Sequence, residues 1–200
     1  NIASYITQLT FHSYEEVRLI ELYCMSTYYV TRELPFEQFS EALRFYKQFG
    51  HVGRALKASL FFIQIELQQK PYEHVLTAVE AVAIYAEEHN HLIDATLLLD
   101  IYYIKGVVES GAGFYEEAAL SLKQCLTISA QHSIYSKHAR TLQLLCFVMY
   151  QLQHEELERL LQQFKAYISF TENYFEKGLY DYVYFFMQNR LQNTGEHSSI

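Results

Sequence analysis

The clearest structural signal in this sequence is GVVESGAGFYEEAALSLKQCL, residues 106–126. After Tyr115 it carries Ala118, Leu122 and Cys125 at the spacing of one face of an α-helix. Before Tyr115, the Gly-Ala-Gly sequence at 111–113 interrupts another periodic run, and glycine favours a turn. The segment therefore predicts the end of one helix, a short turn and the start of a second helix.

Three further helix starts look like this one. The four starts lie near residues 36, 72, 115 and 154, at spacings of 36, 43 and 39 residues. Each has a glutamate in its first turn, which suits the positive end of the helix dipole. Pro35 and Pro71 suit a first turn that needs no backbone N–H donor. Repeats of this length indicate a solenoid of helix pairs, so each start is expected to open the second helix of a pair.

A second periodic run precedes each start, and we expect it to form the first helix of the pair. Ser13 and Glu16 form the pattern of a capping box just before the first run. The four runs cover residues 14–31, 52–69, 91–110 and 136–151.

These elements predict one repeat domain over residues 1–190, with a terminal helix at about 173–190. Residues 2–9 are interpreted as the last turns of an earlier helix. Residues 191–200 are polar without a helical pattern, and we expect them to be a linker or tail. Because the sequence begins at Asn1 without a methionine, we expect a fragment of a longer protein.

The composition argues against two classes of partner. The formal net charge is −8, the pI is near 5.6, and only 15 residues are Lys or Arg, whereas nucleic-acid binding needs a clustered basic surface. No apolar run reaches the roughly 18 to 20 residues of a membrane span, because Glu66 and Asp100 interrupt the most apolar segments. Seven Gly and two Pro leave long uninterrupted helical runs, which favours an all-α protein.

The cysteines indicate a reducing compartment. Cys24, Cys125 and Cys146 are odd in number and have no CxxC spacing. We therefore expect reduced, mostly buried thiols in a cytoplasmic protein.

A search for catalytic chemistry finds no motif. Glu88 and His91 form one ExxH pair, whereas a di-iron bundle needs two. The HEELE segment at His154 lacks the second histidine of a zinc-protease motif, and no phosphate-binding loop or serine-nucleophile motif occurs. We expect no catalytic residue, no metal and no cofactor, and we place Glu88 to His91 in a turn between helices.

The unit at 106–126 resembles the tetratricopeptide repeat family, whose small, Gly, Tyr, Ala, bulky and small positions are here Gly106, Gly113, Tyr115, Ala118, Leu122 and Cys125. The resemblance covers about residues 13–190. The other repeats depart from the family pattern, with larger residues at the alanine position. The resemblance implies an all-α, right-handed superhelix of antiparallel helix pairs. HEAT-like helical repeats have a similar length and are the alternative.

In the tetratricopeptide family, the first helices of successive pairs line a concave groove that holds an extended peptide or a partner helix. The resemblance implies the same surface here. Lys57 and Arg32 are then available to pair with a ligand carboxylate, and Gln64 to bond a peptide backbone. The implied groove positions are Tyr28, Arg32, Lys57, Gln64, Gln68, Asp100, Tyr103, Met149 and Tyr150.

The terminal helix is unusually aromatic. Phe175, Tyr182 and Phe186 share one helical stripe, whereas Tyr184 lies off it. A helix that is apolar on several faces needs partners on several faces. These four residues therefore form a candidate surface for self-association, or they close the array.

Together these features predict a non-catalytic module that binds a protein or peptide in the concave groove and serves a larger signalling or regulatory protein. It is similar to the sensory arrays that bacteria attach to diguanylate cyclases or to helix-turn-helix regulators. Two alternatives are a homodimerisation or scaffold array without a small ligand, and a HEAT-like adaptor.

Overall fold

The structure, a computed structural model, describes residues 13–195, with side chains as far as Gln188. Over those residues it contains nine α-helices, one short 3-10 helix and no strand, which confirms the expected all-α class. The elements are α2 (Tyr14–Thr31), α3 (Phe36–Gln48), α4 (Val52–Gln69), α5 (Tyr72–Glu88), η1 (Asn90–Leu92), α6 (Ala95–Gly111), α7 (Tyr115–His132), α8 (His138–Gln151), α9 (Leu157–Phe170) and α10 (Tyr174–Gly195).

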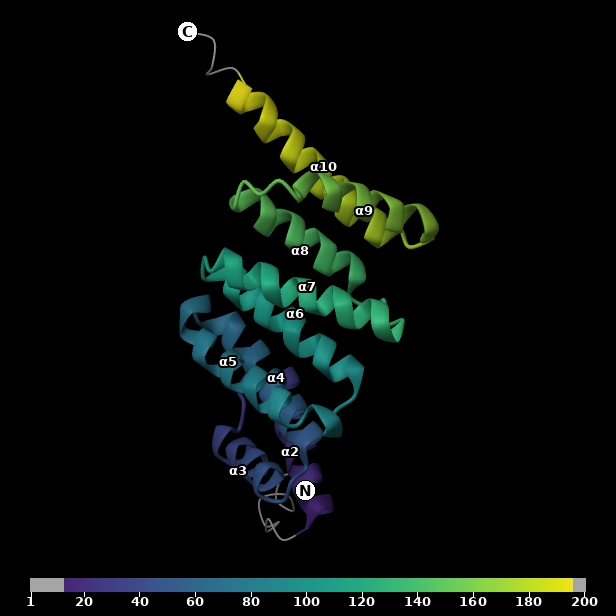
Figure 1. Ribbon diagram of the computed structural model, residues 1–200. Helices are drawn as coiled ribbons and strands as arrows, with labels where there is room; N and C mark the ends of the chain where they lie inside the picture. The colour runs from purple at the N-terminus through teal and green to yellow at the C-terminus, as the bar shows by residue number, and fades with distance from the viewer. Residues whose placement is uncertain (1–12, 196–200) are drawn as a thin grey trace.

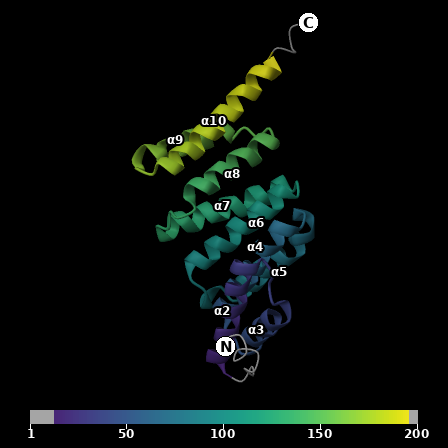
Figure 2. The ribbon, with the colours of Figure 1, turned by 180° about the vertical axis from the view of Figure 1, so that it is seen from behind.

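The helices stack as pairs along one long axis (Figure 1). The pair α2–α3 lies at one end, followed by α4–α5, α6–α7 and α8–α9, and α10 lies across the other end (Figures 1 and 2). Each helix packs against the next helix in the chain, and α10 also packs against α8. This arrangement is the predicted α-solenoid of antiparallel helix pairs.

Most helices begin where the repeat predicts. The second helices α3, α5 and α7 begin at Phe36, Tyr72 and Tyr115. The first helices α2 and α4 have the expected bounds, whereas α6 begins at Ala95 and α8 at His138, later than the predicted 91 and 136. Asp94 sets the start of α6, because its carboxylate caps the helix by accepting a backbone N–H at 2.7 Å. The 3-10 helix η1 occupies the turn expected near His91.

The fourth second helix, α9, begins at Leu157 and not near 154. After α8, the N–H of His154 donates to the carbonyl of Met149 at 2.9 Å, and Gln153 adopts a φ of 51°. This left-handed residue closes the end of α8. His154 and Glu155 therefore belong to the turn, and the HEELE pattern overestimates the length of α9 by one turn.

The terminal helix also differs from its predicted bounds. α10 continues to Gly195, so residues 191–195, expected to belong to a linker, are helical. The earlier helix expected at residues 2–9, and the tail at 196–200, lie outside the described residues.

Glycine explains the close packing of α6 on α7. A Cβ atom at Gly106 would lie 2.7 Å from Cγ and Cδ2 of Leu122, which is fully buried. Any larger residue would therefore push the two helices apart. The repeat pattern expects a small residue at position 106. The close packing of α6 on α7 gives the physical reason, because there is no room for a side chain there.

In two of the helix pairs, a buried carboxylate links the first helix to the second. Glu109 of α6 is 2% exposed, accepts a hydrogen bond from the Ser121 hydroxyl of α7 at 2.6 Å, and is paired with Lys105. Glu21 of α2 is likewise buried and accepts a hydrogen bond from the Tyr46 hydroxyl of α3 at 2.7 Å. Burial raises the pKa of Tyr46, so its hydroxyl stays protonated and remains a donor. Partners of this kind are required for a carboxylate that has left water.

The three cysteines are free and buried, as the sequence predicts. Burial raises the pKa of Cys24 to about 11 and that of Cys146 to about 12, and it also raises the pKa of Cys125. The thiolate is the reactive form of cysteine. Burial both blocks access of a reagent to these thiols and disfavours their ionisation, so they should react slowly.

We therefore expect the folded protein to resist a thiol-specific disulfide reagent at pH 8, and all three thiols to react at once in urea. The measurement is the absorbance of the released thiolate over time, with the urea sample as the control. Rapid reaction of one thiol in the folded protein would contradict the buried position of that cysteine.

Candidate ligand-binding trough

The first helices of successive pairs enclose two adjoining cavities. The lower cavity, of about 480 Å³, lies among α2, α4 and α6. The upper cavity, of about 410 Å³, lies among α6, α8 and α10. Thr96 and Asp100 of α6 line both, so the two cavities form one surface, which we call the trough.

The lower cavity has an apolar floor and a polar rim. Leu60 and Phe61 of α4 are buried beneath it, and the ring of Tyr29, 62% exposed, lies 5.9 Å from the ring of Phe61. On the rim, Lys57 Nζ is 3.9 Å from an oxygen of Asp94, and both side chains are more than half exposed. An ion pair this long and this exposed contributes little stability. Both charges are therefore accessible to a ligand.

The upper cavity carries charges of both signs. Lys137, which immediately precedes α8, pairs with Asp100 at 3.1 Å. Arg140, one helical turn further along α8, lies over the ring of Phe175, with its guanidinium carbon 5.3 Å from the ring centre. Glu176 of α10 also lines the cavity.

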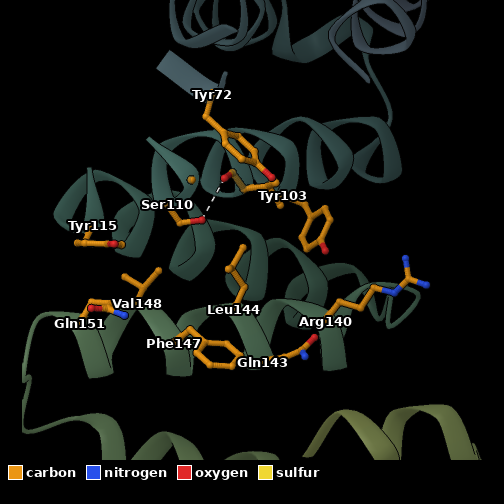
Figure 3. Close-up of a pocket in the computed structure, with 12 residues that line it drawn as sticks. Tyr72, Tyr103, Ser110, Tyr115, Arg140, Gln143, Leu144, Phe147, Val148 and Gln151 are labelled. Carbon is orange, nitrogen blue, oxygen red and sulfur yellow. Dashed lines mark hydrogen bonds between the residues drawn. The ribbon is translucent and has the colours of Figure 1, made fainter. Parts of the chain in front are cut away.

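A third cavity, which we call the side pocket, opens beside the trough between α6 and α8 (Figure 3). Its volume is about 370 Å³. Arg140 lines both the upper cavity and the side pocket. Tyr72 and Tyr115, from the first turns of α5 and α7, complete its wall.

The structure brings several of the predicted groove residues together. Lys57, Gln64 and Asp100 all line the lower cavity. Tyr103 lines the side pocket. Lys137, which lines the upper cavity, has its Nζ 5.0 Å from the centre of the Tyr103 ring.

Two of the predicted groove residues belong to the core. Tyr28 is 3% exposed, and its hydroxyl donates a hydrogen bond to Oε1 of Gln68 at 2.9 Å. Gln68, a predicted groove residue at the end of α4, is therefore engaged within the protein. Met149 is 1% exposed in the core cluster around α8. The ring that lines the lower cavity is that of its neighbour, Tyr29.

The remaining two lie at the margins. Arg32 ends α2 with a φ of 64°, and its guanidinium lies over the ring of Tyr28, away from both cavities. Tyr150 contacts the ring of Phe186 at 6.0 Å, within the interface between α8 and α10.

The sequence interpretation missed Met25, Tyr29, Lys137 and Arg140, all of which line the trough. Arg140 and Gln151 share one face of α8, but nothing in the sequence marks that face as the one that lines the cavities.

The aromatic stripe of α10 contacts residues of α8 in the same chain. Phe175 lies under the guanidinium of Arg140. The ring centroid of Phe147, on α8, lies 6.0 Å from that of Tyr182 and 5.0 Å from that of Phe186. Tyr184 instead stacks on Tyr180 of its own helix at 5.9 Å. Self-association through these residues stays a prediction.

The described residues contain neither a cluster of metal-ligating side chains nor a membrane-spanning helix. Between residues 13 and 188, no group of three or more His, Cys, Asp and Glu side chains is placed to hold a metal ion. Among the helices from α2 to α10, none is both long enough and apolar enough to cross a membrane.

No protein-family model matches the sequence, and no curated protein matches it. Solved structures do show a similar fold. The chain superposes on the crystal structure of aspartyl phosphate phosphatase F from Bacillus subtilis with a TM-score of 0.70 and 17% sequence identity. The match covers 84% of this chain and 44% of that chain, so this sequence spans less than half of the neighbour's length. At this identity the likeness shows the fold alone, and it agrees with the α-solenoid described above.

Proposed function

We propose that this chain is a non-catalytic interaction module of a larger regulatory protein, and that it binds an extended peptide or a helix of a protein partner in the trough. The observation that carries the proposal is the continuity of the two cavities across α2, α4, α6, α8 and α10. A surface that crosses five helices suits a long ligand better than a compact one.

The side chains of the trough support a peptide ligand. The lower cavity offers the ring of Tyr29 over an apolar floor, which suits an apolar side chain. Gln64 is exposed beside it, and its amide is able to donate to and accept from a peptide backbone. Lys57 and Asp94, which hold each other weakly, supply one charge of each sign for orienting the ligand.

A binding role is favoured over catalysis by the state of the acidic groups. Asp100 is paired with Lys137, and Glu176 accepts hydrogen bonds from the hydroxyls of Thr171 and Tyr167. Both carboxylates are thus already engaged by donors of the protein itself. The phosphatase activity in the name of the structural neighbour belongs to that protein.

We also propose that the module is cytoplasmic and belongs to a bacterial regulator. Three free, buried thiols suit a reducing compartment. The bacterial assignment rests on the fold shared with the Bacillus subtilis protein and on the resemblance of the repeats.

The test uses one peptide, selected for binding from an array of random peptides, and a double variant of the trough, Lys57→Ala with Gln64→Ala. We expect the dissociation constant, measured by fluorescence polarisation, to rise about tenfold or more, because one charge and one amide are removed. The matched control is Lys165→Ala with Gln162→Ala, which removes the same residue types from exposed positions on α9.

Circular dichroism of both variants checks that each is folded. Unchanged affinity in the trough variant, an equal loss in both variants, or the absence of any saturable peptide would each contradict the proposal.

A further inference from the structure

The side pocket differs from the trough in its charge. Among the twelve residues that line it, Arg140 is the one charged side chain, and none is acidic. The lower cavity, by contrast, contains Lys57 with two aspartates. The side pocket is therefore a positively charged site, and the trough is a mixed one.

The charge of Arg140 is not neutralised by the described part of the chain. No ion pair joins Arg140 to a described carboxylate. The two acids of the neighbouring upper cavity have other partners: Asp100 pairs with Lys137 at 3.1 Å, and Glu176 accepts from Thr171 at 2.9 Å. The contact recorded for the guanidinium is the ring of Phe175, which positions the group without cancelling its charge.

This charge acts on the interior of the side pocket. Burial raises the pKa of Tyr103, and the positive charge of Arg140 opposes that rise, which means that its field reaches the Tyr103 hydroxyl. Figure 3 shows Arg140, Gln143 and Tyr103 at one end of the pocket, and Tyr115 and Gln151 at the other. A guanidinium, an amide and a hydroxyl therefore lie at the first end.

The middle of the side pocket is apolar. Val107 of α6 lines the pocket together with Leu144, Phe147 and Val148 of α8. From Arg140 to Gln151 the pocket follows α8 for about 16 Å, given the rise of an α-helix. Its volume of about 370 Å³ lies in the range of small-ligand sites.

Glycine keeps one wall of this pocket in place. A Cβ atom at Gly111 would lie 2.5 Å from the ring of Tyr72. Because Gly111 has no side chain, the Tyr72 ring is able to lie directly against α6 and complete the wall.

We infer that the side pocket binds an apolar group that carries one carboxylate, with the carboxylate on Arg140 and the apolar body against Val107, Leu144 and Phe147. A planar carboxylate matches the two parallel donors of a guanidinium. A phosphate group, with nearly two charges, would need more than the single cation present. The inference goes beyond the proposed function, because apart from Arg140 the pocket is lined by residues outside the trough.

Two sources supply this chemistry: a free small carboxylic acid, and the carboxyl-terminal residue of a peptide. The probes are phenylbutyrate with its uncharged amide, and a short peptide ending in phenylalanine with its amidated form. Calorimetric titration is expected to show saturable binding of at least one acid, with the matching amide weaker by about tenfold or more. Binding of phenylbutyrate points to a free acid as the source, and binding of the peptide alone points to a carboxyl terminus.

Three variants locate the site. Arg140→Gln is expected to weaken the acid about tenfold or more without affecting the amide, and Leu144→Trp is expected to abolish both by filling the pocket. Arg44→Gln, which removes an exposed arginine that lines a different cavity on α3, serves as the control and should bind normally. The trough variant Lys57→Ala with Gln64→Ala should also retain the acid, so failure of this inference is separable from failure of the proposed function.

Equal affinity for acid and amide, unchanged binding by Arg140→Gln, or no saturable binding of any of the four probes would overturn the inference. Thermal unfolding of each variant shows whether a loss of binding reflects a loss of folding.

Discussion

Phe164→Ala is expected to lower the free energy of unfolding by about 3–5 kcal/mol, the usual cost of removing a large aromatic ring from a packed core. Phe164 is 0% exposed on the inner side of α9. Its ring meets that of Tyr180 of α10 edge-on, with centroids 5.5 Å apart. The substitution therefore leaves a cavity at the junction of α9 with α10, and it removes one of the contacts that attach α10 to the stack.

The control lies on the same helix. Phe170 is 89% exposed, so Phe170→Ala should change the free energy of unfolding by no more than about 0.5 kcal/mol. Urea unfolding followed by circular dichroism measures both variants against the parent. Because helical repeats unfold in parts when one interface weakens, a broadened transition in Phe164→Ala is an expected accompaniment. Equal stability of the two variants would show that α9 does not hold α10 in this way.

The second large effect concerns the carboxylate buried between α6 and α7. Glu109→Ala should lower the free energy of unfolding by about 3 kcal/mol, because it leaves Lys105 and the Ser121 hydroxyl without their acidic partner. We choose the lower end of the usual range because the Lys105 side chain is 22% exposed and retains some contact with water.

Glu80→Ala, at an exposed position on α5, is the matched control and should be nearly neutral. A double variant, Lys105→Met with Glu109→Leu, separates the loss of a pair from a loss of packing. Since apolar residues often replace a buried ion pair without cost, this variant should recover most of the stability lost in Glu109→Ala. A double variant as unstable as Glu109→Ala would mean that the site cannot be repacked, and a stable Glu109→Ala would contradict the role of the carboxylate.

The fold could be predicted from the sequence because its signal is local. The starts at Phe36, Tyr72 and Tyr115 each combine an aromatic residue, an acid and a following apolar stripe, and the structure begins a helix at each. The predicted start near 154 is too early, because a turn that depends on a left-handed Gln153 precedes α9. Glutamine rarely adopts this conformation, so the sequence does not indicate the turn.

The site was predicted less well, because face assignment depends on single positions. Tyr28 and Tyr29 are the same residue type side by side, and only their burial and the hydrogen bond from Tyr28 to Gln68 show which ring faces inward. On α8 the groove was assigned to Met149 and Tyr150, whereas the upper cavity meets that helix near Lys137 and Arg140.

The side pocket could not be predicted from the sequence at all. Tyr72, Tyr103, Tyr115 and Phe147 come from four different helices, and no local pattern brings them together. They meet because consecutive pairs stack, which is a property of the whole array.

Because the pairs stack along one axis, small changes of angle between them accumulate along the molecule. Each pair packs mainly on its neighbours in the stack, so a small change of angle at one interface is carried to all the pairs beyond it. The lower cavity bridges α2, α4 and α6, and a ligand seated there would set two of these angles at once. The resulting displacement would be largest at the far end of the stack, at α10.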